Sequence, residues 1–250
     1  RQSAPRPYPC WIPERMAELQ AVNHAAPSMQ SRIGHWKQRL VSQRAQLHEE
    51  FSARESPREL LRRQALMVDR LLKDLWVGHA MHRNVALAAV GGFGRGQLFP
   101  CSDVDLLILL SSAADGALAR KIEDLIGALW DIGIEVGHSV RTIDECVALA
   151  AQDITVQTTL LEARLLAGKR DLFGRFVKRM RENLDPAQFM QAKLLEQQQR
   201  HLRYAETNLE PNIKESAGGL RDLQAILWIA RAAGIGKSWR ELAARSVITN

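Results

Sequence analysis

The segment from residue 85 to residue 110 constrains the fold of this chain more than any other. Two apolar runs, 85–90 and 104–110, bracket a loop that contains four glycines, and Asp103 and Asp105 mark the start of the second run. Short apolar runs bounded by glycine are typical of buried strands. Because side chains alternate between the two faces of a strand, we expect both carboxylates to project from one face, roughly 6 to 7 Å apart.

Paired carboxylates beside a glycine loop predict a site for a metal ion and a polyphosphate. Two adjacent carboxylates repel each other unless a cation lies between them, and their hard oxygen atoms suit Mg²⁺ or Mn²⁺. Gly91 and Gly92 have no Cβ, so their backbone can approach a ligand closely and direct amide N–H groups at phosphate oxygens. Arg95 adds a positive charge to the same loop.

Two commoner glycine motifs do not fit this loop. A P-loop requires Lys and then Ser or Thr after its last glycine, whereas Gln97 and Leu98 follow Gly96. A dinucleotide-binding fingerprint that starts at Gly92 has Gln97 where its sixth position requires glycine, and Pro100 interrupts the helix that should follow. Both classes of nucleotide site are therefore excluded.

The order of strand, Gly-Gly turn and Asp-x-Asp strand resembles the nucleotidyltransferase superfamily with the DNA polymerase β type of palm. Within that superfamily, three segments resemble the bifunctional uridylyltransferase/uridylyl-removing enzymes of the PII nitrogen regulator, both in amino-acid sequence and in their order along the chain. These segments are residues 90–105, 130–141 and 208–223. The resemblance covers about residue 60 to the end. It implies an α+β fold, in which helices pack on a small mixed β-sheet of the palm type and a helical domain follows.

The resemblance also implies an activity. A metal-dependent enzyme of this family would move UMP from UTP to a tyrosine hydroxyl of the PII signal protein and release pyrophosphate, as part of nitrogen regulation. Neither the base nor the acceptor follows from the motif itself. An adenylyltransferase of the glutamine synthetase type therefore remains an alternative, as does a catalytically silent domain that binds a nucleotide or a regulator.

The expected site draws on residues outside the loop. Glu135 lies between Ile134 and Val136 on an expected third strand, so it is the candidate third acidic ligand; a strand-edge glutamate that faces water is the alternative. Paired glycines at the start of a helix favour contacts with anions. Gly218 and Gly219 stand at the start of the helix expected at 219–233, so we expect the segment around them to contribute to the site. The expected catalytic and metal-binding residues are Asp103, Asp105 and Glu135, with Mg²⁺ or Mn²⁺ as cofactor. The expected nucleotide-binding residues are Gly91, Gly92, Arg95, Ser102, Lys214 and Arg221.

The periodicity of apolar residues predicts three parts. Residues 1–58 should form a tail and a basic helical arm, 59–152 the nucleotidyltransferase domain, and 153–250 a helical domain that begins a larger region. Strands are expected at 85–90, 104–110 and 133–141, and only helices after residue 141. Helices are expected at 32–53, 57–78, 116–131, 142–151, 153–167, 171–183, 186–207 and 219–233.

Composition narrows the partners. The chain has 250 residues and a net charge of +6, and residues 1–63 hold eleven Lys and Arg against six Glu, so most of the excess lies far from the glycine loop in sequence. No nucleic-acid partner is expected, because a basic amphipathic arm is more often simply solvated. The apolar runs are too short to cross a bilayer, and three unpaired cysteines suit a reducing compartment, so the cytoplasm is expected.

Members of this family continue into a phosphohydrolase domain with a His-Asp pair and into domains that sense glutamine. None of the seven histidines in this chain is followed by Asp. We therefore expect the uridylyl-removing activity and the response to glutamine as effector to be absent from this chain, and we expect the chain to be the N-terminal part of a longer protein.

Overall fold

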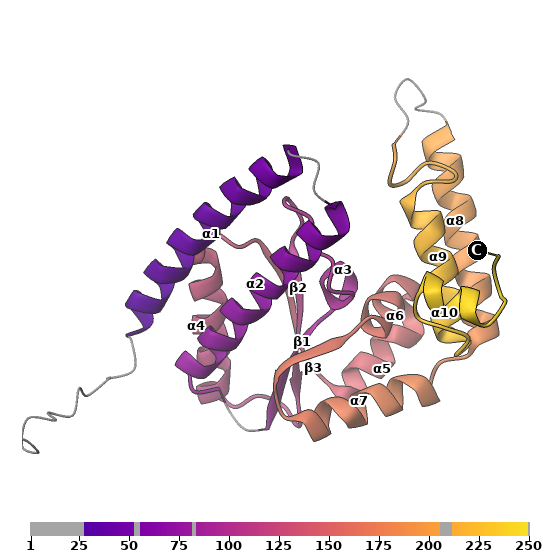
Figure 1. Cartoon of the computed structure of the whole chain (residues 1–250). Coiled ribbons are helices and arrows are strands. Elements are labelled where there is room, and N and C mark those ends of the chain that lie inside the picture. Colours follow the sequence, from indigo (N-terminus) through magenta and orange to yellow (C-terminus); the bar gives the residue numbers. More distant parts are fainter. Residues whose placement is uncertain (1–27, 53–55, 82–83, 206–211, 250) are drawn as a thin grey trace, which may run out of the picture.

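The computed structural model of the chain describes residues 28–52, 56–81, 84–205 and 212–249 (Figure 1). A four-stranded mixed sheet lies at its centre, in the order β3-β2-β1-β4. The pair β1·β2 and the pair β1·β4 are antiparallel, whereas β2 and β3 are parallel. The strands are β1 (Val85–Ala89), β2 (Val104–Leu110), β3 (Val136–Thr142) and β4 (Arg164–Gly168). The predicted α+β class is confirmed. The first 27 residues of the tail and arm predicted at 1–58 lie outside the described residues.

Helices cover both faces of this sheet, and a further helical group lies beside it (Figure 1). The first face carries α1 (Met29–Ser52), α2 (Pro57–Gly78) and α4 (Gly116–Ile132). The second face carries α5 (Ile143–Gln152), α6 (Ile154–Leu161) and α7 (Arg170–Glu182). The glycine loop contains the single turn α3 (Gly91–Gly94), and the helical group consists of α8 (Pro186–Ala205), α9 (Leu220–Ala232) and α10 (Trp239–Ala244).

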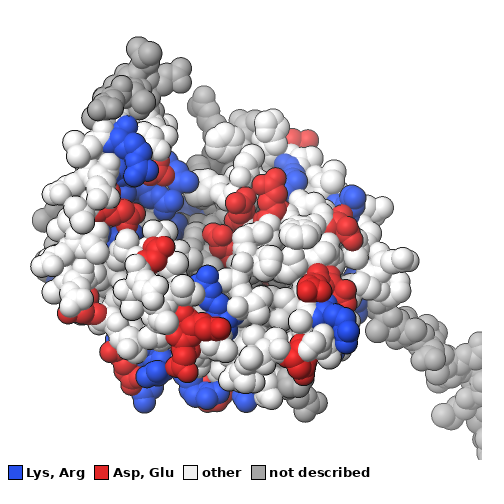
Figure 2. Space-filling model, turned by 180° about the vertical axis from the view of Figure 1, so that it is seen from behind, with Lys and Arg blue, Asp and Glu red and all other residues white. Residues whose placement is uncertain are grey.

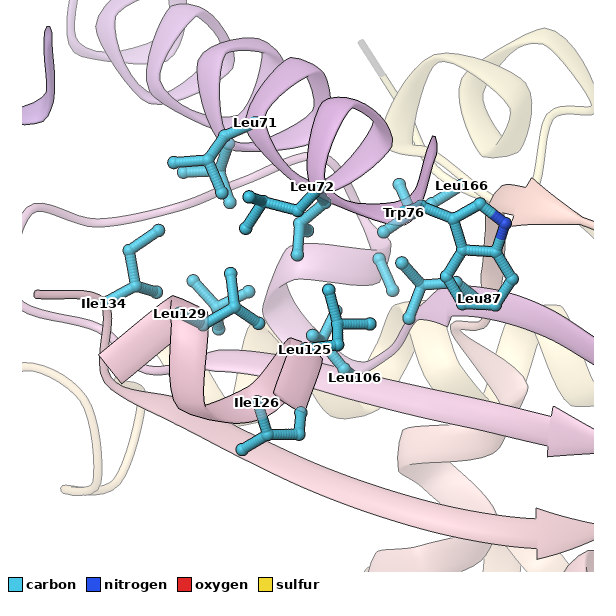
Figure 3. Packing of buried hydrophobic residues seen from close by; sticks show 14 of the residues in the cluster. Leu71, Leu72, Trp76, Leu87, Leu106, Leu125, Ile126, Leu129, Ile134 and Leu166 are labelled. Atoms are coloured by element: carbon cyan, nitrogen blue, oxygen red, sulfur yellow. The ribbon is translucent and has the colours of Figure 1, made fainter. Parts of the chain in front are cut away.

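The main core lies between the first face of the sheet and helices α2 and α4 (Figure 3). Leu71 and Leu72 of α2 and Leu125 of α4 are completely buried, and they meet Leu87 of β1 and Leu106 of β2. Burying a leucine side chain contributes about 2 kcal/mol. This core therefore fixes the position of the strand that carries Asp105.

The second face is lined by the alternate residues of the same strands. Ala86 and Ala88 of β1, with Leu107 and Leu109 of β2, pack against α5, α6 and α7. The strict alternation places Val104 in the main core. Asp105 therefore lies on the second face, in line with Leu107 and Leu109.

The helix predicted over 153–167 is present only in its first part, and the prediction of no strand after residue 141 was wrong. Helix α6 ends at Leu161, and β4 then pairs with the free edge of β1. The apolar run 165–167 fits a helix and a strand equally well, so only the tertiary pairing decides. The sheet consequently reaches Gly168, beyond residue 152, and α10 was not predicted either.

Other helices follow local signals that the sequence carries. The helix predicted at 142–151 begins with a capping box, in which Thr142 Oγ1 accepts from the Glu145 amide and Glu145 Oε2 accepts from the Thr142 amide. Helix α4 begins at an Asp115 cap and ends at Gly133, whose φ of 93° is left-handed. Among the described helices, none has the length and apolar character needed to cross a membrane.

Asp222 holds the helical group together. Its carboxylate accepts hydrogen bonds from the Gly218 amide at 2.7 Å, Arg200 Nη2 at 2.5 Å and His201 Nε2 at 2.9 Å. Burial raises the pKa of Asp222, but these bonds and one from Gln197 outweigh it and lower the pKa to about 2. The ionised carboxylate therefore ties α8, the 212–219 loop and α9 together.

Replacing Asp222 with Asn should cost about 1 to 3 kcal/mol of unfolding free energy at neutral pH, because charged donors lose their acceptor. The folded pKa lies below the unfolded value of about 4, so the stabilisation is complete above pH 4 and is lost as pH falls toward 2. Urea unfolding of both proteins between pH 2 and pH 7 should show a difference that shrinks with acid. A difference that stays constant across this range would contradict the account.

Candidate active site

The glycine loop forms a tight turn at the end of β1. Gly91 has a φ of +56°, which favours glycine, and it starts the single turn α3. The Val90 amide donates to the Asp105 carbonyl at 3.0 Å, which ties the loop to the start of β2. The first amides of such a turn have no acceptor within it. They are therefore free to meet a ligand over Asp105.

Gly94 is required for a different reason. A Cβ at this position would lie 2.2 Å from the Glu162 carbonyl oxygen and 3.1 Å from the Ala89 carbonyl oxygen. The loop thus packs directly against the chain between α6 and β4. Arg164 reinforces it, since its guanidinium donates to the carbonyls of Gly94 and Phe93.

Arg164 itself is held by an acid of α2. Its Nη1 and Nη2 donate to the two carboxylate oxygens of Asp69 at 2.7 and 3.0 Å. Such two-point pairs fix the geometry of both partners. The glycine loop is therefore anchored to α2 and to β4 before any ligand binds.

The Asp105 carboxylate lies between two glycines. A Cβ on Gly91 would approach Oδ2 to 3.2 Å, and a Cβ on Gly137 of β3 would approach Oδ1 to 2.6 Å. Gly137 is the neighbour of Asp105 in the parallel ladder. A side chain at position 137 would therefore displace the carboxylate.

Asp103 lies just before β2 and is exposed, whereas Asp105 is partly buried. Burial raises the pKa of Asp105, and the negative charge of Asp103 raises it further. Both causes would be relieved by a bound cation, which is the property expected of a metal site. Within the described ranges, no group of three or more His, Cys, Asp or Glu side chains gathers as a metal site. A cation at this place would therefore have to draw Asp103, Asp105 and its other ligands together.

A cavity of about 430 Å³ opens above Asp105, between the sheet and the helical group. Thr155, Thr158 and Thr159 of α6 form part of its wall. The helical group contributes four cations to the opposite wall, namely Lys193, Arg200, Arg203 and Arg221. Figure 2 shows a hollow on this side of the molecule, with both basic and acidic side chains around it.

The cations of this wall are oriented by acids. Lys193 Nζ lies 2.6 Å from Glu196 and stacks on the Trp228 ring at 4.6 Å. Arg221 Nε lies 3.4 Å from Glu215. Because these partners fix the side chains in advance, binding an anion here costs little further ordering.

The structure brings together most of the expected nucleotide-binding residues. Gly91, Gly92, Arg95, Asp105 and Arg221 all line the cavity. They come from the glycine loop, β2 and α9, so segments far apart in sequence meet at one place.

The remaining expected residues lie elsewhere. Asp103 and Glu135 line a neighbouring shallow hollow with Trp130, and the Glu135 carbonyl accepts from the Val104 amide at 2.9 Å. Ser102 lines an apolar groove of about 730 Å³ beside α1 and α2. Lys214 is exposed and does not line the cavity above Asp105.

Glu162 was missed by the sequence analysis. It is only 3% exposed, its Oε2 lies 2.5 Å from Arg95 Nη1, and its Oε1 accepts from Trp228 Nε1 at 2.7 Å. One carboxylate thus connects the glycine loop to α9. The sequence feature that could have indicated its burial is its position between two pairs of leucines, 160–161 and 165–166.

Lys193 and Arg200 were also missed. They are seven residues apart on α8, which places them on the same face of the helix, and both are buried. Their burial could not be predicted, because the residues that cover them, Trp228 and Asp222, lie on α9.

Comparisons with known proteins agree, over most of the chain, with the resemblance seen in the sequence motifs. It is 50% identical over 219 residues to the bifunctional uridylyltransferase/uridylyl-removing enzyme of Chromobacterium violaceum, which covers 87% of this chain and 26% of the relative. The enzymes of the same name from Aromatoleum aromaticum and Nitrosospira multiformis are 50% and 51% identical over 224 and 220 residues. These alignments cover 89% and 85% of this chain, and 26% and 25% of the relatives.

Residues 188–250 also match the family described as GlnD PII-uridylyltransferase. The chain spans about a quarter of the length of the curated relatives it matches. The resemblance inferred from the sequence motifs is thereby confirmed, and the chain is related over most of its length to the bifunctional uridylyltransferase/uridylyl-removing enzymes.

Proposed function

We propose that this chain carries the nucleotidyl-transfer site of a PII uridylyltransferase, which moves UMP from UTP to a tyrosine hydroxyl of the PII signal protein and releases pyrophosphate. The names of the relatives support the uridylyl part of this proposal. The observation that carries the chemistry is the position of Asp105, which faces the glycine loop on one side and a cation-lined cavity on the other.

We propose that Asp103 and Asp105 hold Mg²⁺ or Mn²⁺, with Glu135 as the third acidic ligand. The donor set fits, because carboxylate oxygens suit these ions and because burial and the neighbouring charge of Asp103 raise the pKa of Asp105, an effect that a bound cation would oppose. When bound, the metal would favour ionisation of the attacking hydroxyl and offset the charge on the leaving pyrophosphate. Glu135 lies beside Asp103 in the adjoining hollow, which supports its candidacy.

The nucleotide would lie between the two walls of the cavity. The amides of Gly91 and Gly92, with Arg95, would cradle the phosphates from the sheet side. Arg221, Lys193 and Arg200 would neutralise them from the helical group, because charge-assisted hydrogen bonds to phosphate are strong. Held in this way, the α-phosphorus would be presented to the acceptor hydroxyl for in-line attack.

The identity of the nucleotide is tested by labelling. The chain should transfer more label to a PII protein from α-³²P UTP with Mg²⁺ than from α-³²P ATP, as measured on denaturing gels, and a PII protein whose acceptor tyrosine is replaced by Phe should stay unlabelled. Preferential transfer from ATP would reject the uridylyl assignment. Absence of transfer from either nucleotide would reject this chain as the catalytic unit.

The metal site is tested by Asp105→Asn. The amide keeps the shape of the side chain but removes the charge that binds the cation, so the rate of UMP transfer should fall at least about a thousandfold. Asp131→Asn is the matched control, since Asp131 is an exposed acid of α4, and its rate should equal that of the unchanged protein. Wild-type labelling by the Asp105 variant would exclude this site.

Position 137 provides a test by geometry alone. Gly137→Ala should leave the melting temperature nearly unchanged, because the contact is with the end of a flexible side chain, yet it should displace the Asp105 carboxylate and lower the transfer rate about tenfold or more. Gly174→Ala, in α7 with no atom near its Cβ, should have no effect on the rate. Equal rates for the two variants would show that the position of Asp105 does not matter.

A further inference from the structure

A second cavity of about 480 Å³ lies on the opposite side of α6 from the candidate active site. Thr155, Thr158 and Thr159 of α6 face the first cavity, whereas Leu160 and Leu161 face the second. Its other walls come from α7 and from the α9–α10 segment. The cavity therefore lies at the junction between the sheet and the helical group.

The charged lining of this second cavity is predominantly basic. Arg181, Arg231, Lys237 and Arg245 line it, against a single acid, Glu241. The Glu241 carboxylate already accepts from the Lys237 amide at 2.9 Å. Four cations around one engaged carboxylate create a positive potential that a bound anion would neutralise.

Arg231 is the least exposed of these cations. It is partly buried, and no hydrogen bond or ion pair of its guanidinium is found among the described residues. The nearby carboxylate of Glu162 is already occupied by Arg95 and Trp228. A guanidinium does not lose its proton in a protein, so Arg231 stays charged. Its partial burial is therefore unfavourable, because no ion pair within the described part of the chain offsets the loss of hydration.

The pKa of Arg231 agrees with this geometry. Desolvation lowers it and repulsion by Arg181 and Arg95 lowers it further, while the attraction of Glu162 and Glu241 partly opposes these effects. An anion in the cavity would attract Arg231 and so offset the repulsion by Arg181 and Arg95.

The remaining lining limits the kind of anion. Leu160, Phe176, Val177 and Met180 form an apolar part of the lining. A bare inorganic ion would leave this part exposed to water, whereas a ligand with an apolar body would cover it.

We propose that the second cavity binds a small organic anion, in which a phosphate or carboxylate group on an apolar or aromatic body pairs with Arg231, Arg181 and Arg245. The cavity volume lies within the range of small-molecule sites. This site is separate from the proposed nucleotide site and does not depend on that activity.

The proposal is tested by calorimetric titration of the whole 250-residue chain with phenyl phosphate, benzoate and benzyl alcohol. Saturable one-to-one binding is expected for at least one of the two anions and not for the neutral alcohol, and the tighter anion identifies the preferred group. Absence of saturable binding by both anions, or equal binding of the alcohol, would overturn the proposal.

Variants locate the binding. Arg231→Gln should weaken the affinity for the bound anion about tenfold, and the exposed Arg245→Gln about threefold, since each loses a charge-assisted hydrogen bond. The matched control Arg240→Gln, an exposed residue of α10 outside the cavity, should leave the affinity unchanged. Because Arg231→Gln could disturb folding, Arg245→Gln carries the test independently, with thermal melts of each variant alongside.

A variant of the first cavity distinguishes the two sites. Arg221→Gln removes a cation from the cavity above Asp105 and should not change the affinity of the anion. Loss of binding in Arg221→Gln, with unchanged binding in Arg231→Gln and Arg245→Gln, would place the anion in the nucleotide cavity and overturn the proposal.

Discussion

The carboxylate of Asp105 lies between two glycines, and a Cβ at either position would come within 3.2 Å of one of its oxygens. Gly91 closes one side and Gly137 the other, so the backbone of the loop and of β3 approaches the acid directly. This close approach requires β2 to be fixed, and the main core under Leu106 and Leu87 provides that rigidity. Packing of the main core on the first face of the sheet thus determines the position of the Asp105 carboxylate on the second face.

The second constraint is the connection between the sheet and the helical group. Glu162 accepts from Arg95 of the glycine loop and from Trp228 of α9, and Trp228 in turn stacks on Lys193. A buried carboxylate is costly unless its partners are present, so each contact supports the others. The two walls of the cavity are therefore positioned relative to each other by one buried acid, and a shift in either wall would change the shape of the cavity between them.

Local patterns predicted much of this arrangement. The alternation of β2, the apolar stripes of α2 and α4 and the Thr142 capping box each depend on neighbouring residues, so they can be read from the chain itself. Strand β4 could not be predicted, because its apolar run gains strand character only by pairing with β1. For the same reason Glu162 and Arg200 escaped notice, since their partners Trp228 and Asp222 lie far away in sequence. Lys214, chosen because it lies near paired glycines, is exposed outside the cavity.

The most direct measurement is a crystal structure of the chain with Mg²⁺ and a non-hydrolysable UTP analogue. The account predicts a metal ion about 2.1 Å from carboxylate oxygens of Asp105 and Asp103, with the phosphates against the amides of Gly91 and Gly92 and facing Arg221. A triphosphate bound away from the glycine loop, or a metal ion that does not touch Asp105, would contradict it.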